Sequence, residues 1–211
     1  TIGINKVAKA KPDGYTLLLM HIGMATAPAL YRKLPYDTLN DFEFIGQVAD
    51  VPMTMLGKKA LPPNNLKELL PYIKANKDKL NYGNAGIGAA SHLCGLLFMS
   101  QIEADLNTVS YKGTAHAMVD LMGGQIDLYC STIVGLVPFT RSGKLKGLGV
   151  TSNKRADSMP EMPTIAEAGV PGYELSSWYG ILAPAKTPRP IVDQLNAAVV
   201  KIVAMPDGQK K

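Results

Sequence analysis

The sequence predicts a mixed α/β protein built on doubly wound, mostly parallel sheet, and three observations lead to this class. Between residues 80 and 151, short apolar runs alternate with stretches of helical periodicity, which implies parallel strands joined by helices. The 20 glycines and 15 prolines are scattered along the chain, as many short connections require. Apolar residues make up 46% and charged residues 18%, which is a globular composition. No apolar run reaches the roughly eighteen residues of a membrane span.

The first fifty residues are expected to contain two strands. The near-continuous apolar run at 15–20 predicts a strand buried on both faces, and Pro28 fits the first turn of a helix. In chain order we expect an opening helix, a turn at 12–14, the strand at 15–20, a loop of small residues at 21–27, a helix at 28–33 and a strand at 42–49.

A break at 50–52 is followed by a further extended run, with no helix between. This pattern predicts a crossing between two lobes. We assign residues 1–50 plus 183–211 to lobe 1 and residues 51–182 to lobe 2, with the hinge near 50–52 and 177–183. The chain opens with Thr1 and no leader peptide, so lobe 1 is interpreted as truncated at both chain ends.

Lobe 2 is expected to repeat a strand, a turn and a helix three times. Asn65 can cap a helix before these repeats, but Pro71 within that helix predicts a kink or a late start. Thr164 and Glu167 form a capping box, which predicts another short helix. The expected order is strand 80–82, helix 91–102, strand 106–111, helix 115–122, strand 125–130, helix 134–142, strand 146–151, strand 176–183 and a final helix from 187.

Small and polar residues follow four of the expected strands, at 21–26, 84–91, 111–114 and 131–132. In doubly wound sheets, ligands bind beyond the carboxyl ends of the strands. Helix amino termini there present free amides and a positive dipole end to an anion. The Gly86-Ile87-Gly88 turn is either a ligand cradle or only a tight connection. It matches neither the dinucleotide fingerprint nor a P-loop. We favour the cradle, with Ser131 at a neighbouring strand end.

Nothing in the sequence predicts catalysis, a metal or a cofactor. His21, His92 and His116 have no metal-site spacing, and no nucleophile elbow is present. The net charge of +5 is spread along the chain, which favours a soluble surface and indicates no nucleic-acid partner. Cys94 and Cys130 fit no zinc or redox motif. We interpret them as buried free thiols, with a disulfide between them as the alternative.

Trp178 and Tyr179 lie in the strand expected at 176–183. Core packing is the first interpretation of the pair, and the wall of a ligand cleft is the second.

Motifs along almost the whole chain resemble those of the tripartite tricarboxylate transport receptors, also called Bug receptors. The motifs are Lys9-Ala10-Lys11-Pro12-Asp13-Gly14-Tyr15-Thr16-Leu17-Leu18, Leu34-Pro35-Tyr36-Asp37 with Asp41-Phe42, Gly86-Ile87-Gly88 with Ser91-His92-Leu93, Tyr111-Lys112-Gly113, Val150-Thr151-Ser152, Met162-Pro163-Thr164 with Glu167-Ala168-Gly169, and Trp178-Tyr179-Gly180 with Ala183-Pro184. Pro71 departs from the family, which has an ordinary helix former there.

This resemblance implies a periplasmic receptor of type II binding-protein architecture, in which two lobes close on an organic acid and a membrane permease receives it. The acid would be a di- or tricarboxylate, an acidic amino acid or an aromatic acid. The resemblance places a ligand-contacting segment before Thr1. The ligand contacts that it implies within this chain are Gly23, Met24, Ala25 and Thr26 of lobe 1, the backbone amides of Ala85, Gly86, Gly88 and Ala90, and Gly113 with Thr114 for a second polar end.

Three alternatives stay open. A receptor of the same fold can pass its signal to a regulatory partner, a transcription factor can use the same two lobes to bind its effector, and an α/β enzyme would need a nucleophile or metal. We expect a monomer with no cofactor.

Overall fold

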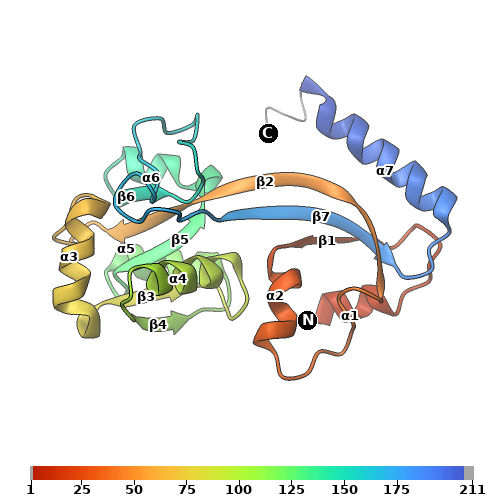
Figure 1. The fold of residues 1–211 in the computed structure, drawn as a ribbon, viewed down its shortest axis with the longest axis horizontal. Helices are drawn as coiled ribbons and strands as arrows, with labels where there is room; N and C mark the ends of the chain where they lie inside the picture. Colours follow the sequence, from red (N-terminus) through yellow and green to blue (C-terminus); the bar gives the residue numbers. More distant parts are fainter. Residues whose placement is uncertain (1, 207–211) are drawn as a thin grey trace. The chain divides into compact units, whose positions relative to one another are not determined.

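A computed structural model describes residues 2–206, and the contacts between Cα atoms divide the chain into two compact units (Figure 1). Unit 1 contains the described residues up to Asp50 and from Trp178 onward, and unit 2 contains Val51–Ser177. The second crossing therefore lies at 177/178, whereas the sequence analysis placed it at 182/183. Tyr179 to Leu182 belong to unit 1 because they pair with His21 to Leu18.

Unit 2 is a doubly wound sheet with the strand order β6-β2-β5-β3-β4. β3 pairs in parallel with β4 and β5, while β2 pairs antiparallel with β5 and β6. Its elements are the second part of β2 (Phe42–Lys58), α3 (Leu66–Asn76), η1 (Lys77–Lys79), β3 (Asn81–Asn84), α4 (Ala90–Gln101), β4 (Asn107–Ser110), α5 (Thr114–Gly123), β5 (Leu128–Thr132), η2 (Ile133–Gly135), α6 (Val137–Arg141) and β6 (Leu145–Val150).

Helices cover both faces of this sheet because alternate strand residues point to opposite sides. Leu128 and Cys130 of β5 pack on one face with the apolar sides of α3 and α4. Tyr129, between them, packs on the other face with Ala117 and Leu121 of α5. The predicted alternation of strands and helices is thus present, with boundaries shifted by a few residues. The prediction of a mostly parallel sheet was wrong, because β2 runs antiparallel to β5 and β6.

Two predictions for unit 2 were wrong in detail. Pro71 does not delay α3, which begins directly after the Asn65 cap, where the Asn65 side chain accepts a hydrogen bond from the amide of Glu68. The capping box forms, since Thr164 and Glu167 each accept from the other's amide at 3.0 Å. The segment that it opens nevertheless remains a turn and does not become a helix.

The predicted break at 50–52 is also absent, because β2 runs as one strand of 17 residues. Pro52 has no N–H to donate. The ladders of β2 with β5 and β6 begin only at Met53 and Thr54, so the missing donor costs no hydrogen bond in these two ladders.

Unit 1 contains the first part of β2 and a strand pair with helices. Its other elements are α1 (Ile2–Ala8), β1 (Leu18–His21), α2 (Gly23–Leu30), β7 (Ser176–Pro184) and α7 (Arg189–Ala204). β1 pairs antiparallel with β7. Leu19 is 61% exposed, so the prediction of a strand buried on both faces was wrong for β1. The predicted loop at 21–27 and helix at 28–33 are replaced by α2, which starts at Gly23.

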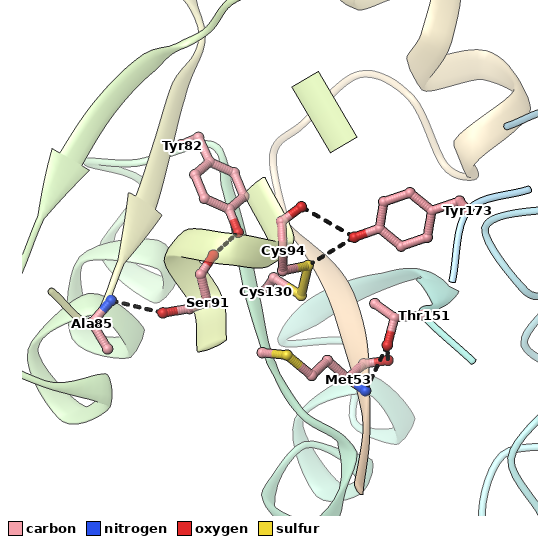
Figure 2. Close-up of a disulfide and its surroundings, with 8 residues drawn as sticks. All are labelled: Met53, Tyr82, Ala85, Ser91, Cys94, Cys130, Thr151 and Tyr173. Carbon is pink, nitrogen blue, oxygen red and sulfur yellow. Dashed lines mark hydrogen bonds between the residues drawn. A yellow bond between two sulfur atoms is a disulfide. The ribbon is translucent and has the colours of Figure 1, made fainter. Parts of the chain in front are cut away.

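The free-thiol interpretation of the cysteines was wrong. Cys94 of α4 and Cys130 of β5 form a disulfide with a Cα–Cα distance of 6.4 Å (Figure 2). Both side chains are fully buried in the core between α4 and the sheet. Among the described helices, none combines the length and apolar character needed to cross a membrane.

Candidate functional site

The carboxyl ends of β3, β4 and β5 bring three of the predicted segments to one edge of the unit 2 sheet. Asn84 pairs with Ser110, and Gly83 pairs with Tyr129, so the three parallel strands end side by side. The amide of Tyr111 donates to the carbonyl of Asn84 at 2.9 Å. The segments 85–90, 111–114 and 131–132 are therefore neighbours, as the parallel topology predicted.

The segment between β3 and α4 folds through side chains that accept from its own amides. The amide of Gly86 donates to Asn84 Oδ1 at 2.9 Å, and the amide of Ala85 donates to Ser91 Oγ at 2.9 Å. The amide of Gly88 donates to His92 Nδ1 at 3.3 Å. Both glycines have positive φ, at 125° and 79°, which only glycine adopts without strain.

The amides of Ala85, Gly86 and Gly88, predicted to bind a carboxylate, thus hold the loop together in this structure. The amide of Ala89 donates to the carbonyl of Gly86 at 3.0 Å, and the amides of Ala90 and Ser91, which open α4, follow it. The first amides of a helix have no acceptor within the helix, and the N-cap residue Ala89 supplies no side-chain acceptor. No acidic residue lies in the first turn of this twelve-residue helix.

The start of α4 is therefore the part of this segment that is suited to an anion. It combines the positive end of the helix dipole with amides that have no acceptor within the helix, and no acidic side chain lies in its first turn. Burial lowers the pKa of His92, which favours the neutral ring that can accept from Gly88.

The second segment, 111–114, is held by two tyrosines. Gly113 is the N-cap of α5 with a φ of 124° and supplies no side-chain cap. Tyr129 donates its hydroxyl to Thr114 Oγ1 at 3.2 Å. Tyr111 donates to Asp120 Oδ2 at 2.7 Å. Burial and the bond to Asp120 raise the pKa of Tyr111 to about 12. Thr114 is exposed and points its hydroxyl oxygen at a fixed donor.

Ser131 lies within β5 and not in the turn that was predicted after it. It pairs with Thr54 of β2 and is only 7% exposed. Its position at the same edge of the sheet agrees with the prediction, but its side chain is largely closed to solvent in this structure.

The four residues predicted for lobe 1 form the first turn of α2 in unit 1. The amide of Gly23 donates to His21 Nδ1 at 3.0 Å, and Thr26 donates to the carbonyl of Gly23 at 3.4 Å. Met24 is 2% exposed and belongs to the core of unit 1. Ala25 is exposed and Thr26 half-buried, so these two present the most accessible surface of the group.

Sequence reasoning missed a hollow of about 310 Å³ on the strands of unit 1, lined by Phe44, Gly46, Gln47, Trp178, Gly180, Ile181 and Leu182. The structure thus places Trp178 in the wall of a cavity within its own unit. Gly46 and Gly180, which lack side chains, are the sequence signal that was available.

A larger cavity of about 740 Å³ in unit 2 is lined by residues of α3 and of the 155–168 segment. Its lining contains three carboxylates and two cations, and one of the cations, Arg155, is already paired with Glu167, which disfavours an anion.

No group of three or more metal-ligating side chains comes together within residues 2–206. Asp127 pairs with Lys58 at 2.7 Å and accepts from the amide of Asn81. Its role is therefore structural.

Comparisons with known proteins agree with the resemblance noted in the sequence. The model of the tripartite tricarboxylate transporter family receptor matches residues 1–211. The UPF0065 protein of the TAR-I ttuE-ttuC' intergenic region of Agrobacterium vitis is 41% identical over 199 residues, which cover 94% of this chain and 58% of that protein. The chain spans about three fifths of the length of this and two other curated relatives that it matches.

Solved structures show the same fold. The periplasmic binding protein BugD is 47% identical with a TM-score of 0.90 and coverage of 99% of this chain and 70% of its own. MatC from Rhodopseudomonas palustris, solved with bound malate, is 37% identical with a TM-score of 0.90 and coverage of 100% and 72%. An R. palustris protein solved with adipate is 35% identical with a TM-score of 0.92 and coverage of 98% and 70%.

Proposed function

Because the chain belongs to the tripartite tricarboxylate transporter receptor family, we propose that it is part of a periplasmic receptor that captures a small organic carboxylate between two lobes and delivers it to a membrane permease. The protein catalyses no reaction in this proposal.

The structure at the start of α4 is the main support for the proposal. The amides of Ala90 and Ser91 have no acceptor within the helix, the N-cap residue supplies no side-chain acceptor, and the first turn contains no acidic residue. A carboxylate placed there gains charge-assisted hydrogen bonds and the favourable end of the dipole. We assign one carboxylate of the ligand to Ala90 and its neighbours in the 85–90 loop.

Gly113 and Thr114 would contact a second polar end of the same ligand. They lie on the loop that contacts the first one, since Tyr111 bonds to Asn84. Two such neighbouring positions suit a dicarboxylate, and similar structures were solved with malate and adipate. Ser131 at the same edge, and the turn from Gly23 to Thr26 on the other lobe, complete the proposed contacts.

The disulfide supports an oxidising compartment such as the periplasm. Disulfides persist in secreted and periplasmic proteins and are rare where thiols are kept reduced. The buried Cys94–Cys130 bond is an observation about this chain itself, which makes it independent of the family.

A thermal-shift screen of the full-length protein tests the proposal. Dicarboxylates, tricarboxylates, acidic amino acids and aromatic acids are compared with the corresponding amides. A ligand that binds only the folded state adds about 2.7 kcal/mol of stability at one hundred times its dissociation constant. We expect an acid to raise the melting temperature and its amide to have no effect.

Stabilisation by amides and acids alike, or by no acid at millimolar concentration, would contradict the proposal. Replacing Thr114 by Val keeps the shape of the side chain and removes its hydroxyl, so we expect weaker binding of the acid that the screen identifies. Thr108 lies at the exposed edge strand β4, and Thr108→Val serves as the matched control that should leave binding unchanged.

A further inference from the structure

The Cys94–Cys130 disulfide joins α4 and β5, two elements that border the proposed ligand site in unit 2. Cys94 is in the second turn of α4, and Cys130 is in β5, the strand that ends at the site. Both cysteines are 0% exposed. The bond therefore joins the helix that presents the first segment to the strand beside it.

On the helix side, Ser91 connects the disulfide to the loop. Ser91 lies one turn before Cys94 on α4, and its hydroxyl accepts from the amide of Ala85 at 2.9 Å (Figure 2). Its carbonyl accepts from the Tyr82 hydroxyl at 2.5 Å. A shift of the first turns of α4 away from the sheet would move Ser91 and break its hydrogen bonds with Ala85 and Tyr82.

The helix is also held close to the sheet around Cys94. A Cβ atom at Gly95 would lie 2.2 Å from Cε1 of Tyr82, so only glycine permits this approach. Tyr173 donates its hydroxyl to the Cys94 carbonyl at 3.1 Å and lies 3.3 Å from Cys94 Sγ (Figure 2). Cys94 thus contacts Tyr173, and its neighbour Gly95 packs closely against Tyr82.

On the strand side, the residue before Cys130 reaches the second segment of the site. Tyr129 donates its hydroxyl to Thr114 Oγ1 at 3.2 Å. One covalent bond therefore links the support of the 85–90 loop, through Ser91, to the support of Thr114, through Tyr129.

We propose that the Cys94–Cys130 disulfide is a positioning element of the ligand site, so that carboxylate affinity depends on its redox state. This inference rests on the proposed function. Reduction by a dithiol breaks the S–S bond with two electrons and two protons and yields two thiols, while the dithiol becomes a disulfide. Without the bond, the start of α4 and Thr114 are no longer held at a fixed separation, and a ligand that contacts both must order them on binding.

Because ligand binding and disulfide reduction are thermodynamically linked, the coupling can be measured either as a change in ligand affinity or as a change in the potential of the disulfide. If the oxidised protein binds a ligand more tightly than the reduced protein, the ligand stabilises the disulfide by the same factor. A tenfold difference in affinity lowers the midpoint potential of the disulfide by about 30 mV at saturating ligand. As long as the reduced protein stays folded, a bond that only stabilises the fold shows no such shift.

The test uses the full-length protein with malate as the probe, or with the acid that the screen identifies if malate does not bind. Affinity is measured by calorimetry for the oxidised protein, the reduced protein and Cys94→Ala/Cys130→Ala, and the potential is titrated with dithiothreitol with and without the probe. We expect at least a tenfold loss of affinity on reduction and in the double variant, with a more negative potential in the presence of the probe.

Controls separate positioning from stability. Leu69→Ala removes a fully buried side chain of α3 from the same core. It therefore lowers stability while Ser91 and both cysteines are kept, and it should bind as the wild type does. Ser91→Ala should weaken binding less in the reduced protein than in the oxidised one, because coupled residues are not additive.

Equal affinities of the oxidised and reduced forms with an unshifted potential would overturn this inference alone. Circular dichroism identifies a reduced form that has unfolded. Any ligand of the folded state then shifts the potential, so the affinity of Cys94→Ala/Cys130→Ala, measured at a temperature at which this variant is folded, decides the question. An oxidised protein that binds no carboxylate would overturn the proposed function and this inference with it.

Discussion

Ser91 contributes two acceptors at the start of α4, its hydroxyl to the amide of Ala85 and its carbonyl to Tyr82. Only the hydroxyl is lost in Ser91→Ala. We expect a loss of stability of about 1 kcal/mol, the usual net value of one hydrogen bond. We also expect weaker carboxylate binding, because the 85–90 loop loses the hydrogen bond from the Ala85 amide to Ser91.

Urea melts and calorimetry measure the two effects of Ser91→Ala. Ser100→Ala is the matched control, because Ser100 lies at the exposed end of the same helix. If both variants bind equally well, Ser91 has no part in shaping the site.

His92 and His21 each accept a hydrogen bond from a backbone amide at Nδ1. Burial lowers the pKa of both rings below the ordinary value of 6.5. The unfolded chain therefore takes up protons at a higher pH than the folded one. Their stabilising contribution is complete above pH 6.5 and is lost as the pH falls through the lowered folded values.

We accordingly expect the free energy of unfolding to decrease from pH 7.5 to pH 5, and to decrease less in His92→Asn and in His21→Asn. Urea melts across this range measure the effect. His116 is exposed, and His116→Asn serves as the control. A pH dependence that is the same in all four proteins would contradict the assignment.

At the scale of elements, the packing of α4 on β3 depends on one position without a side chain. Ala at position 95 would bring Cβ to 2.2 Å from the Tyr82 ring. Overpacking of a core costs about 1–3 kcal/mol, and we expect Gly95→Ala to lose stability in this range.

Gly123→Ala is the matched control, because nothing lies within 4 Å of a Cβ at that helix end. Its effect on thermal unfolding should be neutral or slightly stabilising. Equal melting temperatures for the two variants would show that Tyr82 moves aside without cost.

At the capping box, the local sequence pattern predicted the hydrogen bonds correctly and the type of secondary structure wrongly. The capping box at Thr164 and Glu167 makes both of its bonds, yet no helix follows it. Its chain turns back through the bond from the amide of Val170 to the carbonyl of Ile165, and Ile165 is buried in the core. Burial of this side chain outweighs the weak local preference for helix.

On the scale of the whole molecule, each of the five hydrophobic clusters of the described residues lies within one unit. Unit 2 is also one continuous stretch of chain, Val51–Ser177. We therefore expect residues 51–177 expressed alone to fold cooperatively and to form the disulfide, because the fragment contains all of its own cores.

Residues 51–150 provide the comparison, since this shorter fragment lacks Ile165, Ala168, Val170 and Tyr173 of the largest cluster. We expect it not to fold. Urea unfolding followed by circular dichroism distinguishes the two, and a non-cooperative transition for 51–177 would show that unit 2 depends on unit 1.

The α/β class, the alternating strands and helices of unit 2, the edge at which 85–90 and 111–114 meet, and the family could all be predicted from the sequence. These properties follow from local periodicity, from strand direction and from motifs spread along the chain, none of which requires knowledge of distant contacts.

Only the tertiary structure decided which amides near the site are available and how the cysteines are paired. The amides of Ala85 and Gly88 are occupied because Ser91 and His92 turn back onto the loop. Cys94 and Cys130 are 36 residues apart and meet because α4 packs against β5. Hydrogen-bond partners and disulfides depend on which side chains converge in space, and spacing along the chain does not specify that convergence.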